Sequence, residues 1–189
     1  MRLSRRLKPF DHPDYIFELK HDGFRALAYI DADDCRLISR NANAFRSFSA
    51  LRESLGKLPV DNAILDGEII CMDKVGRSQF NELLSLTGKP VFYAFDLLWL
   101  DGEDLRSLPL IERARRLQEP LQRSNCERIF YAQHVEEHGI AFFKQICDHD
   151  LEGIVAKRRL SAYRNNGIGW LKIKNPACSQ AEGRHELFE

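Results

Sequence analysis

One lysine stands at the end of an apolar segment and directly before a turn signal. It is Lys20, within the stretch Glu18-Leu-Lys-His-Asp-Gly-Phe-Arg25. Taken alone, a lysine in that position is commonly a solvated strand end. A lysine whose pKa is lowered by partial burial or by neighbouring cations is instead an amine nucleophile near neutral pH. Lys20 is therefore the candidate nucleophile of this chain.

Carboxylates interrupt several apolar segments further along the chain. Asp66 and Glu68 lie inside one such segment, and Glu152 comes directly before another. Burial of a carboxylate is costly unless it is paired or bound to a metal. Each of these could still be an ordinary charge on an edge strand. Phe95, beside the strand-end carboxylate of Asp96, could form one wall of a slot for a stacked base.

The basic residues are unevenly distributed, although the 28 Lys and Arg residues balance the 28 Asp and Glu residues. Net charge therefore predicts no attraction of the whole protein to nucleic acid. Between Gly153 and Ala181, however, there are six basic residues and no acidic one. Alternation places Lys172 and Lys174 on one face of a predicted strand. A polyanion lying between them would relieve their mutual repulsion.

The elements that must position these residues are mostly short strands. Runs of β-branched and aromatic residues bounded by turn residues predict strands at Tyr15–Leu19, Phe24–Ile30, Cys35–Ser39, Ala63–Cys71, Val91–Trp99, Arg128–Ala132, Gly153–Lys157 and Gly169–Lys174. Helical spacing of apolar residues predicts helices at Phe45–Leu58, Leu110–Leu117 and Ile140–Ile146, and a short one at Phe80–Leu86. Turn residues at Asp22-Gly23 and Asp31–Asp34 predict two hairpins. An antiparallel α+β fold follows.

Length and composition exclude several classes of protein. The chain has 189 residues, 44% hydrophobic and 30% charged, enough for a globular core in one domain or two very small ones. It contains no apolar window of membrane-spanning length and no signal-peptide core, which predicts a cytoplasmic protein without a membrane partner. The five cysteines are widely spaced, as expected of reduced structural thiols rather than a metal site.

Taken in order, the motifs resemble the adenylation domain of ATP-dependent DNA ligases of the bacterial end-joining type, within the covalent nucleotidyltransferase superfamily. The matching segments are Glu18–Arg25, Ser39-Arg40-Asn41, Asp66-Gly67-Glu68, Phe95–Leu98, Glu152–Lys157 and Trp170–Lys174. The resemblance implies an ATP-grasp-like α+β fold of two twisted, mainly antiparallel sheets flanked by helices. The domain would occupy residues 1–174, followed by a polar tail at 175–189.

The resemblance also implies a covalent mechanism. Lys20 would attack the α-phosphate of ATP, expel pyrophosphate and hold AMP as a phosphoramidate, and AMP would then pass to the 5′-phosphate of nicked or broken DNA. The implied contacts are the adenine edge for Glu18, the base face for Phe95, the ribose for Arg40 and Glu68, and the phosphates for Lys157, Lys172 and Lys174. Glu152 and Asp22 would hold Mg²⁺ or Mn²⁺, and Arg25 with Asp22 would support Lys20 and the acceptor end.

Two features depart from the family pattern. Ala42 stands where the family has a glycine, so a turn of positive φ there would be strained and would displace Arg40. Only 15 residues follow Lys174, too few for the family's OB-fold. We therefore expect a standalone catalytic domain that uses an OB-fold or an end-joining partner supplied in trans; the alternative is a complete ligase truncated to this domain.

Two other functions are compatible with the same residues. The lysine motif is shared with RNA ligases and with capping-type nucleotidyltransferases, although the segment from Phe92 to Gly102 resembles DNA ligases more closely. The chain could also be a non-catalytic module that binds nucleotides or DNA ends. Labelling with each nucleoside triphosphate distinguishes these possibilities.

Overall fold

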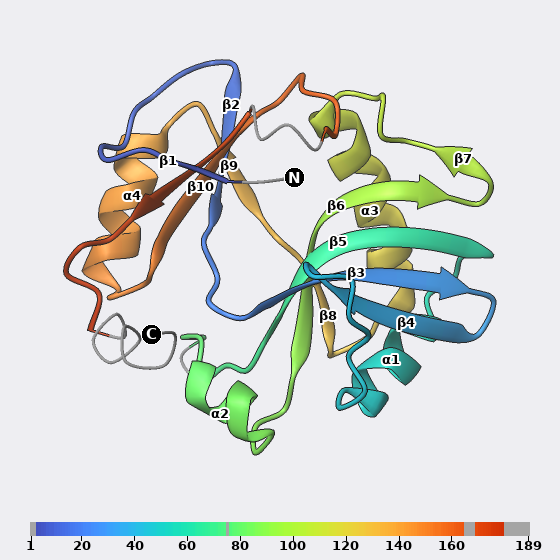
Figure 1. The fold of residues 1–189 in the computed structure, drawn as a ribbon. Coiled ribbons are helices and arrows are strands. Elements are labelled where there is room, and N and C mark those ends of the chain that lie inside the picture. The colour runs from blue at the N-terminus through green and yellow to red at the C-terminus, as the bar shows by residue number, and fades with distance from the viewer. Residues whose placement is uncertain (1–2, 75, 165–168, 180–189) are drawn as a thin grey trace. The chain divides into compact units, whose positions relative to one another are not determined.

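The computed structural model describes residues 3–74, 76–164 and 169–179 (Figure 1). The chain divides into two compact units. The terminal unit consists of Met1–His21 and Gln133–Glu189, and the central unit consists of Asp22–Ala132. The division falls directly after Lys20 and His21, so the candidate nucleophile belongs to the terminal unit.

The terminal unit is built on a five-stranded sheet with the strand order β1-β11-β10-β2-β9. Its strands are β1 (Ser4–Arg5), β2 (Tyr15–Leu19), β9 (His134–Glu136), β10 (Gly153–Arg158) and β11 (Trp170–Lys174). Neighbouring strands are antiparallel except β1 and β11. Helix α4 (Gly139–Asp148) lies against β10 and β2 (Figure 1). The core between this helix and the sheet includes Phe17, Ile146, Ile154 and Ile173.

The central unit is built on a six-stranded sheet with the order β4-β3-β5-β6-β7, and β8 pairs with β6. Its strands are β3 (Phe24–Asp31), β4 (Asp34–Ser39), β5 (Asn62–Ile70), β6 (Val91–Leu100), β7 (Glu103–Asp104) and β8 (Ile129–Tyr131). Its helices are α1 (Ser49–Gly56), α2 (Phe80–Ser85) and α3 (Leu110–Ser124). Only the β6–β8 pair is parallel. Both α1 and α3 pack on the strands of this sheet.

Alternation along the strands gives the central sheet one buried and one half-buried face. On β3, Ala26 and Ala28 are buried while Arg25 is half-buried. On β6, Ala94 is buried and Phe95 is half-buried. Three side chains predicted to bind a nucleotide, those of Arg25, Glu68 and Phe95, therefore lie on the face opposite the packed core.

The predicted α+β fold of two mainly antiparallel sheets with flanking helices is confirmed. All eight predicted strands are present, with ends within one residue of those predicted, and all four predicted helices form. The sequence analysis missed β1, β7 and β9. These strands have only two or three residues, which is too short for alternation to show.

One of the two predicted hairpins is wrong. Asp22-Gly23 does not join paired strands, because β2 pairs with β10 and β9 whereas β3 pairs with β4 and β5. The chain instead passes at this point from one sheet to the other. Gly23 is needed because a Cβ there would overlap the carbonyl oxygen of Ile69 on β5. The second hairpin, at Asp31–Asp34, is confirmed.

The start of the predicted polar tail remains attached to the terminal unit. Asn175 and Cys178 are buried, and the Asn175 side-chain amide donates a hydrogen bond to the carbonyl oxygen of Leu151. Residues 180–189 of the predicted tail lie outside the described residues.

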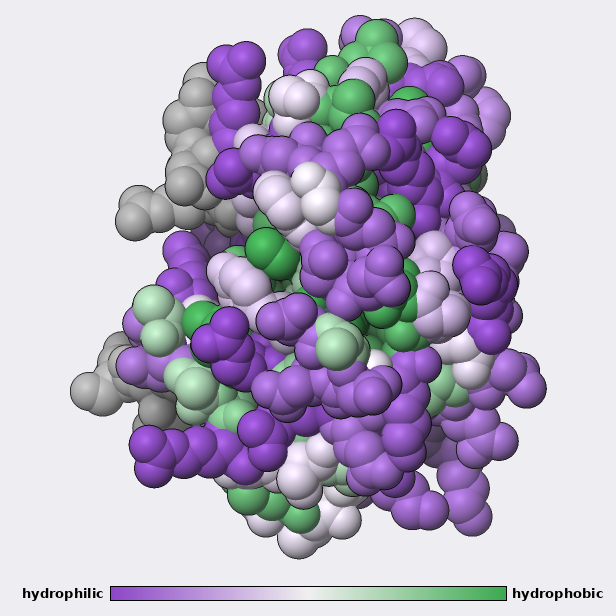
Figure 2. All heavy atoms as spheres, turned by 90° about the vertical axis from the view of Figure 1, so that its right-hand side faces the viewer, coloured by the Kyte–Doolittle hydropathy of each residue, from purple (hydrophilic) through white to green (hydrophobic). Residues whose placement is uncertain are grey.

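Three further observations concern the cysteines, the surface and the length of the helices. All five cysteines are free thiols. Hydrophilic side chains cover most of the face shown in Figure 2, with hydrophobic residues visible between them. No helix in the described ranges is long and apolar enough to cross a membrane.

Candidate active site

The predicted nucleophile is paired with a predicted metal ligand. Lys20 follows the last residue of β2, and its backbone N–H donates to the carbonyl oxygen of Gly153 at 2.9 Å. Its Nζ donates to Oε2 of Glu152 at 2.6 Å, with the two side chains 17% and 10% exposed. Gly153 has a φ of 144° and approaches the carbonyl oxygen of Ile173 too closely for a Cβ. A glycine is therefore needed at the first residue of β10, directly after the Glu152 that contacts Lys20.

A second predicted cation completes this cluster. Lys174 is opposite Gly153 in the β10–β11 pair, and its Nζ lies 3.6 Å from Oε1 of Glu152. One carboxylate thus lies between two lysines, and the half-exposed Lys174 leaves the cluster accessible. Lys172, two residues earlier on β11, is half-buried opposite Val155.

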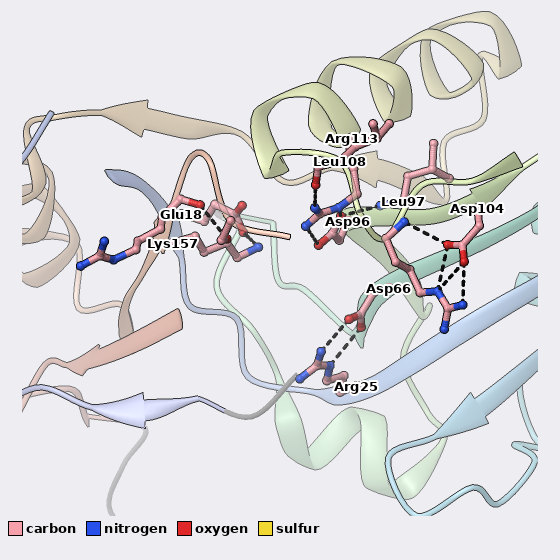
Figure 3. A network of polar contacts seen from close by, with 12 residues as sticks. Glu18, Arg25, Asp66, Asp96, Leu97, Asp104, Leu108, Arg113 and Lys157 are labelled. Atoms are coloured by element: carbon pink, nitrogen blue, oxygen red, sulfur yellow. Dashed lines mark hydrogen bonds and ion pairs between the residues drawn. The ribbon is translucent and has the colours of Figure 1, made fainter. Parts of the chain in front are cut away.

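Glu18 and Lys157 form a second, more deeply buried pair in the terminal unit. The Lys157 Nζ lies 2.6 Å from Oε2 of Glu18, with side chains 2% and 6% exposed (Figure 3). The same Nζ lies 4.0 Å from the ring centroid of Trp170, a cation–π contact. Lys157 was predicted to neutralise phosphates, and the sequence analysis missed its pairing with Glu18 and its contact with Trp170.

His134 is the cross-strand neighbour of Glu18 on β9. Burial lowers the pKa of His134; Glu136 opposes this shift, and Lys157 and Arg159 add to it. A neutral imidazole beside the buried Glu18–Lys157 pair is therefore favoured in the folded protein.

In the central unit, Arg25 connects a buried carboxylate to the predicted base-stacking ring. Its Nε and Nη2 donate to Oδ1 and Oδ2 of Asp66 at 3.0 and 2.5 Å (Figure 3), the two-point geometry that guanidinium and carboxylate groups favour. The Arg25 Cζ lies 5.6 Å from the ring centroid of Phe95. Glu68 is half-buried and is the cross-strand partner of Arg25. The structure therefore gathers these residues on three adjacent strands.

Arg40 and Asp22 also belong to the central unit but lie in its loops. Arg40 is exposed in the turn after β4. Ala42 in that turn has a φ of 60°, and its N–H donates to the carbonyl oxygen of Ser39. The turn therefore adopts the positive φ expected of the family glycine, with alanine in its place. The Asp22 backbone N–H donates to Oγ of Ser78 at 3.4 Å.

The sequence analysis missed a fully buried carboxylate–guanidinium pair. Asp96 and Arg113 are both 0% exposed, and Arg113 Nε and Nη2 donate to the two Asp96 oxygens at 2.7 and 2.8 Å (Figure 3). A signal for Arg113 was present, because it lies in the apolar spacing of Leu110, Ala114 and Leu117 on the predicted helix. A charged residue within an apolar stripe is expected to meet a buried partner of opposite charge.

The donors for a divalent metal are few. Within the part of the chain that the structure describes, no three His, Cys, Asp or Glu residues form a metal-binding group. Mg²⁺ typically uses one or two carboxylates together with water and substrate phosphates. Glu152, 10% exposed between Lys20 and Lys174, could supply one such carboxylate, but the described residues form no site built from protein ligands alone.

A strand-end lysine paired with a carboxylate, on a fold of two mainly antiparallel sheets, is what the resemblance to covalent nucleotidyltransferase domains predicts. Residues 2–174 match the family model described as the ATP dependent DNA ligase domain. The chain belongs to this family, which confirms the resemblance predicted from the motifs.

Curated relatives agree with this assignment. The chain is 32% identical over 168 residues to the multifunctional non-homologous end joining protein LigD of Pseudomonas aeruginosa, covering 85% of this chain and 20% of that protein. It is 32% identical to a DNA ligase of Thermococcus fumicolans (84% of this chain, 32% of that protein). It is 31% identical to the SPbeta prophage-derived DNA ligase-like protein LigB of Bacillus subtilis (93% and 66%). The chain thus spans between a fifth and two thirds of these relatives.

Solved structures also agree. The fold matches mycobacterial DNA ligase D complexed with ATP and MES with a TM-score of 0.77 at 28% identity, covering 92% of this chain and 58% of that one. It matches the ligase domain of Mycobacterium tuberculosis LigD with a TM-score of 0.78 at 27% identity, covering 91% and 58%.

Proposed function

We propose that this chain transfers AMP from ATP to Lys20 and then to the 5′-phosphate of nicked or broken DNA. The observation that carries the proposal is the contact of Lys20 Nζ with Glu152 Oε2 at 2.6 Å, beside the Lys174 ammonium. A reactive amine, a carboxylate and a second cation are the groups that phosphoryl transfer to nitrogen requires. Membership of the ATP-dependent DNA ligase domain family supports the same reaction.

In the first step, the neutral amine of Lys20 attacks the α-phosphorus of ATP in line with the leaving group. A phosphorus–nitrogen bond forms, the bond between the α-phosphorus and the bridging oxygen breaks, and pyrophosphate leaves with that electron pair. The Glu152 carboxylate, within hydrogen-bonding distance of Nζ, would accept the amine proton. Lys174 and Lys172 would stabilise the charge on the phosphate oxygens.

The remaining predicted site residues would bind the nucleoside and the metal ion. Phe95 would stack on adenine, with Arg25 against its ring, while Glu18 would face the adenine edge. Glu68 and Arg40 would bind the ribose. Mg²⁺ bound by Glu152, with Asp22 as a second ligand, would supply positive charge to the phosphates.

In the second step, a 5′-phosphate oxygen of DNA would attack the phosphorus of lysyl-AMP, breaking the phosphorus–nitrogen bond and returning Lys20 as an amine. The names of the relatives, DNA ligase and non-homologous end joining protein, support DNA as the acceptor. We also propose a cytoplasmic location. We expect an OB-fold or an end-joining partner in trans to assist both steps.

Intact-mass measurement after incubation with ATP and Mg²⁺ tests the proposal. The wild-type protein should gain one covalent AMP, and Lys20→Ala and Lys20→Arg should gain none while remaining folded. Lys144→Ala, which changes an exposed lysine on α4, should label as the wild type does. Incubation with each of the other nucleoside triphosphates distinguishes a capping-type enzyme. An unlabelled wild-type protein that still binds ATP would instead support the non-catalytic module.

A further inference from the structure

Phe95 lies at an irregularity in the central sheet. In the β5–β6 pair, Gly67 is opposite Ala94 and Asp66 is opposite Asp96, so that Phe95 has no cross-strand partner on β5. An extra residue of this kind is a β-bulge, and bulges redirect the side chain of the residue that they insert. The backbone pairing of β5 and β6 therefore does not by itself determine the orientation of the Phe95 ring.

The residue directly after the bulge is anchored by a buried ion pair. Asp96 Oδ1 accepts the Leu97 backbone N–H at 2.9 Å and the Arg113 Nε at 2.7 Å, and Oδ2 accepts Arg113 Nη2 at 2.8 Å. The remaining Arg113 terminal nitrogen, Nη1, donates to the carbonyl oxygen of Leu108. Arg113 thus connects the β6 bulge to the segment that leads into α3.

We infer that Arg113 is a positioning residue for adenine binding, acting through Asp96 on the orientation of Phe95. The inference rests on the proposed function, because it assumes that Phe95 stacks on the base. A buried ion pair commonly contributes little net stability compared with apolar packing. The planar two-point contact instead restricts the relative orientation of the Arg113 guanidinium and the Asp96 carboxylate.

A second arginine–aspartate pair, between Arg25 on β3 and Asp66 on β5, also restricts the bulge. Asp66, the cross-strand partner of Asp96, is held by Arg25, and the Arg25 guanidinium lies against the Phe95 ring. Phe95 is therefore positioned by two separate arginine–aspartate pairs. The Arg25 guanidinium lies against the ring itself, whereas Arg113 bonds to Asp96, the residue that directly follows Phe95.

The test uses Arg113→Lys, which keeps the positive charge but loses the two-point contact with Asp96. A matched control is Arg116→Lys, one turn further along α3, where the guanidinium bonds to Glu103 and Glu112. The measurements are the equilibrium dissociation constant for ATP, the rate of covalent AMP formation at saturating ATP, and hydrogen exchange of the 91–100 segment.

Arg113→Lys should weaken ATP binding by about fivefold, a part of the roughly 5- to 150-fold range expected for loss of one base–aromatic stack. The rate at saturating ATP should change less than about twofold, because Lys20 and Glu152 are unaltered. Hydrogen exchange of the backbone amides along β6 should become faster. In the Phe95→Ala background, Arg113→Lys should cause no further loss of affinity. Arg116→Lys should change none of these quantities.

Two outcomes would overturn the inference: unchanged ATP affinity in Arg113→Lys, or losses that add fully to those of Phe95→Ala. If Arg113→Lys fails to fold, the neutral combination Arg113→Gln with Asp96→Asn leaves no buried charge unpaired and should show the same loss of affinity. A wild-type protein that forms no AMP adduct would contradict the proposed function instead. Failure of the inference about Arg113 and failure of the proposed function can thus be distinguished.

Discussion

The Nζ atom of Lys157 lies 2.6 Å from Oε2 of Glu18, with both side chains almost completely buried between neighbouring strands. Removal of one partner leaves an unpaired buried charge, which costs roughly 3–5 kcal/mol. Lys157→Met should therefore lower the free energy of unfolding by about that amount, and Glu18→Leu should have a similar effect. The double variant should recover most of the loss in urea denaturation experiments.

Lys57→Met is the control for this prediction. Lys57 pairs with Glu53 on an exposed surface, with both side chains 69% exposed, and such pairs contribute little. No measurable change in stability is expected. Fully additive losses in the Glu18–Lys157 double variant would show that the two charges are stabilised independently.

Glu152→Gln and Phe95→Ala should separate catalysis from binding. Glu152→Gln removes the carboxylate beside Lys20 and should slow AMP transfer by about 100-fold or more, with ATP affinity largely retained. Phe95→Ala should weaken ATP binding by about 5- to 150-fold through loss of stacking, with a smaller effect on the rate at saturating ATP. Single-turnover labelling and equilibrium titration measure the two quantities. Equal losses of both in the two variants would show that these residues serve packing.

His134 should make stability depend on pH. Its folded-state pKa is lowered, mainly by burial, so the unfolded chain binds this proton more readily than the folded protein. The stabilisation is therefore complete above the unfolded pKa of about 6.5 and is lost as the pH falls below it. His134→Gln should flatten this part of the curve by at most about 1.4 kcal/mol per pH unit.

Ala42→Gly should stabilise the turn after β4. Ala42 has a φ of 60°, a conformation that disfavours residues with a Cβ, and relief of this strain is worth about 1 kcal/mol. Ala44, two residues later, is not among the residues of positive φ. Ala44→Gly should therefore destabilise by roughly 0.5–1 kcal/mol. Chemical denaturation checks both variants, and destabilisation by Ala42→Gly would contradict the prediction.

DNA binding should be weak and sensitive to salt. With few basic segments on a neutral chain, about three or four phosphate contacts predict a slope near −3 for log K against log salt. Reversing the charges of Arg158 and Arg159 should reduce the slope without stopping AMP transfer to Lys20, since Arg158 contacts Tyr15 and Arg159 pairs with Glu136. A tight complex that is insensitive to salt would show that DNA binds elsewhere. Loss of AMP transfer in the reversed variant would place these arginines in the nucleotide site.

Local patterns in the sequence determined the strands and the residues that cluster around Lys20. Runs of β-branched and aromatic residues identified β2, β10 and β11 individually. Glu152, which meets Lys20, and Lys174 beside it lie at the ends of β10 and β11. The strand ends could be predicted because turn residues mark where each apolar run stops. The resemblance, carried by motifs in chain order, supplied the roles that alternation alone could not.

Only the tertiary structure decided which strands pair and which charges meet. Asp22-Gly23 has the composition of a hairpin turn, yet it connects two different sheets, because β2 and β3 bury their edges against strands distant in the sequence. The partners of Asp96 and Lys157 are likewise set by packing between elements, and the bulge at Phe95 is a property of the β5–β6 register. Sequence patterns report which residues face a core, whereas register and ion pairing depend on long-range burial, which no local window contains.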